Sequence, residues 1–128
     1  MAGALPTEPE LQPRLDELRS LLENAPDTVA RRRPEALFRK VTFAIFKPHE
    51  LEEAQHGYSF NPLTGEDLTS GAGGWRRSWV VIGADEDLGD PLFVDISDER
   101  LPVYTAAHGQ GDWDPSRFAR SARTLLRA

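Results

Sequence analysis

The stretch from Trp79 to Thr105, WVVIGADEDLGDPLFVDISDERLPVYT, decides the fold. It opens with the uninterrupted apolar run Trp79–Ile82, whose length and composition are typical of a buried strand. Residues 92–96 alternate, placing three aliphatic side chains on one face of a second strand, and residues 101–105 form a third. Only short, polar turns separate the three segments. The spacing therefore predicts an antiparallel meander.

Upstream of this stretch, the sequence predicts a long helix, a strand and a short helix. From Pro9 onward, leucines recur at the spacing of one helical stripe, and Pro26 ends that helix. Residues 41–46 (VTFAIF) are β-branched and aromatic and indicate a strand, whereas residues 49–55 follow a proline and suit a short helix. The other segments of this half are expected to lack helix and strand: 1–8 (a flexible tail), 27–33 and 57–74.

Downstream of the meander, the sequence predicts a closing helix. Asp114 is a suitable N-cap and Pro115 a suitable first residue. We therefore expect an α+β fold, a mostly antiparallel sheet with N-terminal and C-terminal helices packed on it, in a single domain over residues 9–128. The apolar stripe expected on the closing helix comprises Phe118, Ala119, Ala122, Leu125 and Leu126.

Composition excludes several classes of protein. The chain has 128 residues, 39% of them hydrophobic and 28% charged, as expected of one globular domain. No apolar run is long enough to span a membrane, and the N-terminus does not resemble a secretory signal. Cysteine is absent, which excludes disulfides and thiolate chemistry and fits a reducing compartment such as the cytoplasm. The net charge of −6 argues against a general nucleic-acid binder.

The negative charge is concentrated in one part of the chain. Residues 85–114 contain nine acidic residues and one basic residue, whereas residues 115–128 contain four arginines and no acid. A partner is expected to respond to this acidic block more than to the average charge. The residues that we predict to contact a protein partner are Asp85, Glu86, Asp87, Asp98, Asp112, Trp113 and Asp114.

Catalytic and metal-binding sites are less favoured by the residues present. The acidic turn 85–90 suggests calcium, but its spacing does not follow that of an EF-hand, which needs glycine at the sixth position and glutamate at the twelfth. Asp87 and Asp95 could share acid–base work, although nothing in their spacing brings them together. The three histidines lack zinc-ligand spacing, and no nucleophile motif is present. We therefore expect no catalytic residue, no metal and no cofactor.

Trp75, Trp79 and Trp113 carry the largest apolar surfaces. A role in the core or as a loop anchor is the first expectation for each of them. Trp113 is the best candidate for contact with a partner, because it lies in the polar run 110–114.

The C-terminal half resembles a known family. The segments WVVIG (79–83), GDPLFVD (89–95), PVY (102–104) and H-G-x-G-x-W (108–113), followed by a closing amphipathic segment, are similar to the SUKH superfamily. That superfamily includes the fungal cell-wall-assembly-regulator domain of the SMI/KNR type and many bacterial toxin-immunity proteins. The resemblance implies an α+β fold without catalytic residues or cofactor. Bacterial members bind and block a toxin, often a nuclease.

The N-terminal half departs from the family pattern. Members usually open with a helix, a Leu-Pro step and an Asn-Gly turn, but here Leu5-Pro6 precedes the predicted helix and no Asn-Gly occurs. Residues 46–51 (FKPHEL) do resemble the strand-to-helix step found in the middle of the family. The subfamily, and with it the partner, is therefore left open.

Three functions follow, in decreasing order of support. The first is a cytoplasmic, non-catalytic immunity protein that binds a basic toxin domain through its acidic block. The second is a small regulatory or scaffold domain of the cell-wall-assembly-regulator type. The third is a hydrolase or metal-dependent enzyme that uses the acidic turn. We expect no nucleic-acid or membrane partner, and the oligomeric state is left open.

Overall fold

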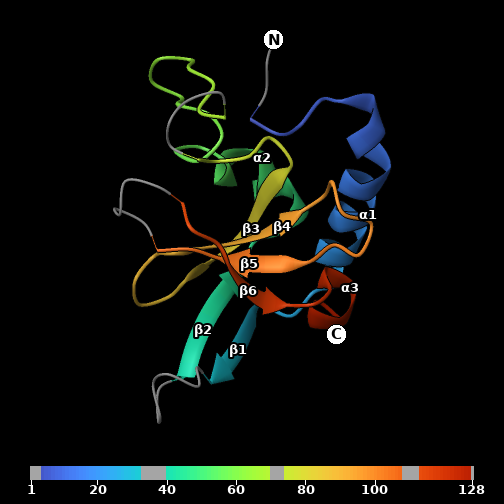
Figure 1. Ribbon diagram of the computed structural model, residues 1–128. Coiled ribbons are helices and arrows are strands. Elements are labelled where there is room, and N and C mark those ends of the chain that lie inside the picture. The colour runs from blue at the N-terminus through green and yellow to red at the C-terminus, as the bar shows by residue number, and fades with distance from the viewer. Residues whose placement is uncertain (1–3, 33–39, 70–73, 108–112, 128) are drawn as a thin grey trace.

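The computed structural model describes residues 4–32, 40–69, 74–107 and 113–127, and within them the chain forms a six-stranded antiparallel sheet. The strands follow one another across the sheet in sequence order, and the sheet is curled (Figure 1). The predicted meander is therefore confirmed, and it extends to further strands on both sides. The strands are β1 (Thr28–Arg32), β2 (Lys40–Ile45), β3 (Trp79–Asp85), β4 (Pro91–Asp95), β5 (Val103–Thr105) and β6 (Ser116–Ala119).

The helices are short, apart from one near the N-terminus. A 3-10 turn at Pro9–Leu11 leads directly into α1 (Gln12–Glu23), so the predicted N-terminal helix is confirmed. A second 3-10 turn, Pro48–Glu50, leads into α2 (Leu51–Ala54), and α3 (Ala122–Leu125) lies near the C-terminus. Separate helices beside an antiparallel sheet make this an α+β chain. Within the described residues, the helices fall short of the length and apolarity that crossing a bilayer requires.

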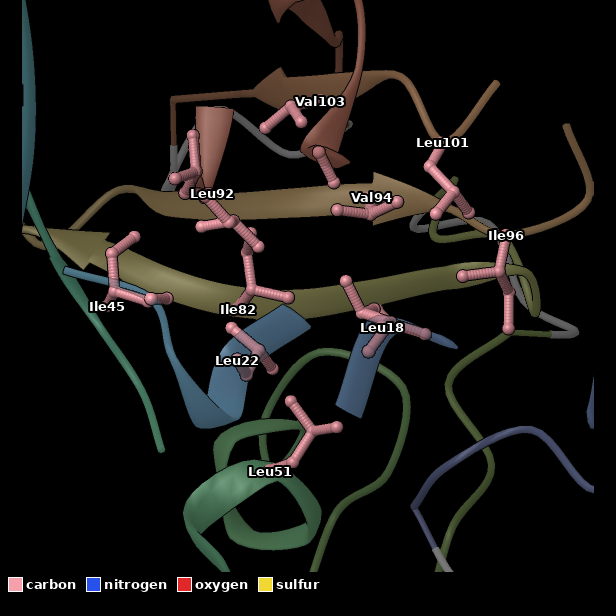
Figure 2. Close-up of a cluster of buried hydrophobic side chains, with 14 of the residues drawn as sticks. Leu18, Leu22, Ile45, Leu51, Ile82, Leu92, Val94, Ile96, Leu101 and Val103 are labelled. Atoms are coloured by element: carbon pink, nitrogen blue, oxygen red, sulfur yellow. The ribbon is translucent and has the colours of Figure 1, made fainter. Parts of the chain in front are cut away.

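One face of the sheet packs into an aliphatic cluster that includes α1. The three buried leucines of α1 share this cluster with alternate residues of β3 and β4, as their two-residue period requires (Figure 2). The cluster thus has the composition of an ordinary hydrophobic core. We call it the aliphatic face; its members include Leu15, Leu18, Leu22, Phe43, Ile45, Val80, Ile82, Leu92, Val94, Ile96 and Leu101.

The other face of the sheet carries aromatic side chains. Phe93 of β4 stands opposite Val81 of β3 on one side and Tyr104 of β5 on the other. These residues alternate with those of the aliphatic face, so their side chains point the opposite way. We call this second cluster the aromatic face; it contains Trp75, Trp79, Val81, Phe93 and Ala106, with Phe46, Tyr58, Tyr104 and Trp113 packed against it.

A glycine permits a close approach of β2 to β3. The pairing of β3 with β4 shifts register between Val81 and Gly83, which indicates a bulge. A Cβ atom at position 83 would overlap the carbonyl oxygen of Ala44 on β2. Gly83 is therefore required by the backbone contact at this bulge.

A buried glutamine continues the sheet where β2 ends. Gln55 is 1% exposed, and its side-chain nitrogen donates to the carbonyl oxygens of Leu51 and Val81, each at 2.9 Å. Its side-chain oxygen accepts from the Val81 amide at 2.8 Å. The glutamine amide thus bonds both backbone groups of Val81, as a neighbouring strand would. Buried backbone groups need such partners, and this contact joins α2 to β3.

Two segments of the N-terminal half differ from the sequence predictions. Residues 28–32, predicted as a connector, form β1. Every residue of this strand pairs with β2, and Val29 is buried. In the predicted flexible tail, Ala4 and Leu5 are buried. The Ala4 amide donates to Glu52, and the Ser59 hydroxyl donates to the Ala4 carbonyl. Long-range partners, which local periodicity does not report, order both segments.

The prediction of a closing helix from Asp114 onward is also wrong for the first half of that segment. Residues 116–119 form β6, paired with β5, and only residues 122–125 are helical. Ser121, rather than Asp114, caps this helix by accepting from the Arg123 amide. The free edge of β5 offers a full set of backbone partners, and such tertiary pairing outweighs the weak helix propensity of a short segment.

Candidate functional site

The acidic turn between β3 and β4 is built around Asp85. This residue is 6% exposed, and its Oδ1 atom accepts from the amides of Asp87, at 2.8 Å, and Leu88, at 3.1 Å. Gly89 completes the turn with a φ of 76°, a conformation that favours glycine. Asp85 was predicted as a partner contact, but its burial and its turn bonds give it a structural role.

Three side chains of the same turn are left exposed. Glu86 and Asp87 are both exposed, and Leu88 keeps 51% of its surface accessible. Because the carboxylate of Asp85 holds the backbone beneath them, these side chains project from an ordered turn. A contact surface of this kind loses little conformational entropy when a partner binds.

The sheet topology brings Asp114 to the same end of the molecule. Leu92 at the start of β4 pairs with Thr105 at the end of β5, and Thr105 pairs with Ser116 at the start of β6. The β3–β4 turn and the segment that enters β6 therefore lie at one end of the sheet. We call this the acidic end; its described members are Glu86, Asp87, Leu88 and Asp114.

The remaining predicted contacts are distributed elsewhere. Asp98 lies in the turn between β4 and β5, at the opposite end of the sheet, where its Oδ1 atom accepts from the Arg100 amide at 2.9 Å. Asp112 falls outside the described residues. The acidic block of the sequence is therefore divided between the two ends of the sheet. Asp87 and Asp95, considered as an acid–base pair, lie at opposite ends of β4: Asp87 in the turn before the strand and Asp95 at its last residue.

Trp113 belongs to the aromatic face. It is half-buried, and its ring centroid lies 5.3 Å from that of Trp75 and 5.5 Å from that of Tyr58. Such packing is consistent with the loop-anchor role expected from the sequence. The indole nitrogen of Trp75 is buried without a hydrogen-bond partner among the described residues. Burial raises the pKa of Tyr58, and the charge of Asp90 adds to the effect.

A surface hollow of about 280 Å³ opens beside Trp113. Two arginines accompany it: the guanidinium carbon of Arg76 lies 5.8 Å from the ring centroid of Trp79, and that of Arg117 lies 5.6 Å from the ring centroid of Tyr104. Guanidinium groups at these distances are attracted by the negative faces of the rings. We call this the aromatic hollow; it is lined by Gly74, Arg76, Trp79, Asp95, Tyr104, Trp113 and Pro115.

Asp95 supplies the carboxylate of the aromatic hollow. Its Oδ1 atom accepts from the Ser97 amide at 3.0 Å and from the Ser97 hydroxyl at 2.6 Å. Its Oδ2 atom accepts no hydrogen bond within the described part of the chain. One oxygen therefore orders the start of the β4–β5 turn, and the other has no bond to the described residues.

The sequence did not identify this hollow. The alternation of residues 92–96 placed Asp95 opposite the aliphatic side chains, and Trp79 was recognised as a large apolar residue. Nothing local to the sequence showed that Tyr104 and Trp113 would lie beside both of them. Among the described residues, no group of three or more histidine, aspartate or glutamate side chains is placed to hold a metal ion.

Comparisons with known proteins leave the site to be interpreted from its own geometry. A scan against protein-family models finds no match, and searches of curated proteins and of solved structures find none either.

Proposed function

We propose that this chain is a cytoplasmic, non-catalytic, SUKH-like immunity protein that binds and neutralises a basic toxin domain through its acidic end. The observation that carries the proposal is the exposure of Glu86, Asp87 and Asp114 at one end of the sheet, with the exposed Leu88 beside them. Apolar contact area framed by charge is typical of a protein-binding surface.

The proposed contact set comprises the exposed carboxylates of the acidic end. Glu86, Asp87 and Asp114 are the direct contacts, and Asp85 supports them by holding the turn. Asp98, at the opposite end, would act only through the long-range field of the protein, which salt screens beyond about 10 Å. Charges at the acidic end would steer a basic partner toward that end and accelerate association.

The alternative proposal is a regulatory or scaffold domain of the cell-wall-assembly-regulator type. The observation in its favour is the presence of two separate surfaces, the acidic end and the aromatic hollow. A scaffold would hold a different partner on each surface, whereas an immunity protein would use its surfaces for a single toxin. Finding two different proteins bound simultaneously would favour the scaffold.

Purification from the native host, followed by mass spectrometry, tests the function directly. The proposal expects a basic toxin domain to be recovered, encoded next to this gene, and expects the protein to protect cells that express that toxin. Recovery of no basic toxin domain, together with no protection against the neighbouring gene product, would contradict the immunity function.

Charge reversal tests the surface. The pair Glu86→Lys and Asp87→Lys should reduce the association rate of the captured partner at least tenfold at low salt and flatten its salt dependence. Glu10→Lys with Glu23→Lys is the matched control, because both glutamates are exposed and the change in net charge is equal. An equal effect of the two pairs would show that net charge, and not the acidic end, controls association.

A further inference from the structure

The aromatic face already binds guanidinium groups of its own chain. Arg76 is exposed, and it donates no hydrogen bond and forms no ion pair within the described residues. Its contact with the Trp79 ring is therefore its principal interaction. An exposed cation–π contact of this kind is weak, on the order of 0.5–1 kcal/mol. Arg76 can consequently leave the ring at little cost.

The aromatic hollow contains a carboxylate and an aromatic ring that Arg76 does not contact. Asp95 lines the same hollow, and its Oδ2 atom accepts no hydrogen bond from the described residues, Arg76 included. Trp113 adds aromatic surface, whereas the Tyr104 ring already contacts Arg117. A group that reached the carboxylate while packing against the rings would gain both interactions together.

The chemistry of the lining favours a guanidinium as the occupant. A guanidinium is planar, stacks on aromatic rings, and donates several hydrogen bonds in a fixed geometry to a carboxylate. An ammonium group lacks the planar face, and a neutral side chain lacks attraction to Asp95. If the entering cation displaces Arg76, the number of positive charges beside the hollow stays the same.

We propose that the aromatic hollow holds one arginine side chain of the protein partner, and that Arg76 occupies part of this site in the free protein. The entering guanidinium bonds Asp95 and packs against the rings while Arg76 moves away from Trp79. This inference rests on the proposed function, in that the partner is basic. It assigns to the partner a specific anchor in addition to its general charge.

A short peptide serves as the probe: one arginine within a glycine–serine sequence, with matched peptides that carry lysine or glutamine instead. Titration is followed by the indole N–H resonances of Trp79 and Trp113 in NMR spectra of the full chain. The arginine peptide should shift these resonances saturably, the lysine peptide should bind more weakly, and the glutamine peptide should have no effect. Equal binding of the glutamine peptide, or no saturable shift, would overturn the proposal.

Two substitutions test the assigned roles. Asp95→Asn keeps an oxygen that can accept from Ser97 but removes the charge, and it should weaken arginine-peptide binding at least fivefold. Arg76→Ala removes the internal competitor and should strengthen binding about two- to fivefold. Weaker binding after Arg76→Ala, or unchanged binding after Asp95→Asn, would contradict the assignment.

Asp67→Asn is the matched control. The Oδ1 atom of Asp67 accepts from the amide of Thr69 at 2.8 Å and also from its hydroxyl, the same pattern as Asp95 and Ser97, but Asp67 does not line the hollow. It should leave peptide binding unchanged; a loss equal to that of Asp95→Asn would show a general charge effect and overturn the site.

The outcomes separate this inference from the proposed function. If a toxin domain is captured and Asp95→Asn does not alter its affinity, the function stands and the hollow is not its anchor. If the arginine peptide binds as expected but no basic toxin is recovered, the site stands and the immunity function fails.

Discussion

The two faces of the sheet bury side chains of different kinds and are expected to have different roles. The aliphatic face shares its cluster with α1, and residues such as Leu18 and Ile82 have no exposed surface (Figure 2). The aromatic face is covered by irregular segments and leaves Tyr104 and Trp113 half-buried beside a hollow. Stability is therefore expected to depend chiefly on the first face, whereas the second face carries the proposed arginine site.

The largest expected effect comes from truncation on the aliphatic face. Leu18→Ala should lower the free energy of unfolding by about 3–5 kcal/mol, because it removes a fully buried side chain and leaves a cavity. Trp113→Ala, on the aromatic face, should cost only about 1–2 kcal/mol, because the ring is half-buried. Urea denaturation measures both. A larger loss for Trp113→Ala would reverse the roles of the two faces.

Gln55→Met should cost about 2–4 kcal/mol, since it leaves both backbone groups of Val81 without their side-chain partner. This change tests whether the stability of β3, a strand that contributes side chains to both faces of the sheet, depends on a polar contact to its backbone. Gln12→Met is the control: its amide donates to two backbone carbonyls at a part-buried site, so a loss below about 1 kcal/mol is expected. Equal losses, again by urea denaturation, would show that Gln55 has no special role.

Gly83→Ala should cost about 2–3 kcal/mol, because its new methyl group would collide with the Ala44 carbonyl. The collision would distort β3, a strand whose side chains belong to both faces of the sheet. Gly89→Ala meets no atom within 4 Å and has only an unfavourable φ, so about 1 kcal/mol is expected. Thermal unfolding of the two variants separates collision from backbone strain. A smaller loss at position 83 would contradict the close approach of β2 to β3.

The smallest effect concerns Glu8, in the N-terminal segment that contributes Leu5 to the aliphatic face. Burial alone would raise the pKa of Glu8, but the hydrogen bond and charge of Arg77, 3.0 Å away, outweigh burial and lower that pKa below its usual value. The stabilisation is therefore fully present above the unfolded-state pKa of about 4.3 and is lost as the pH falls through the lower, folded-state value.

Glu8→Gln should accordingly cost less than about 1 kcal/mol at pH 7, and this cost should disappear once the pH has fallen below the lowered, folded-state pKa of Glu8. Denaturation series from pH 7 downward provide the measurement. Glu10→Gln, at an exposed neighbouring glutamate, is the control for the loss of one carboxylate charge from this segment. A Glu8→Gln variant whose loss grows as the pH falls would contradict the assigned pKa direction.

Local patterns predicted the elements whose side chains repeat regularly. The leucine spacing located α1, and the alternation of residues 92–96 located β4 and assigned its aliphatic side. The edge strands were missed, because β1 and β6 depend on pairing with β2 and β5 rather than on a pattern of their own. The burial of Ala4 and Leu5 in the predicted tail was missed for the same reason, because their hydrogen-bond partners lie about fifty or more positions away in the chain.

The sequence by itself determined the charge, the periodic elements and the meander, since each depends on composition or on neighbours a few residues apart. Only the tertiary structure decided which acidic residues share an end of the sheet. Strand direction sends Asp98 away from Glu86 and brings Asp114 to the same end, and burial removes Asp85 from the surface. The aromatic hollow likewise depends on the packing of segments distant in the chain, which no local pattern records.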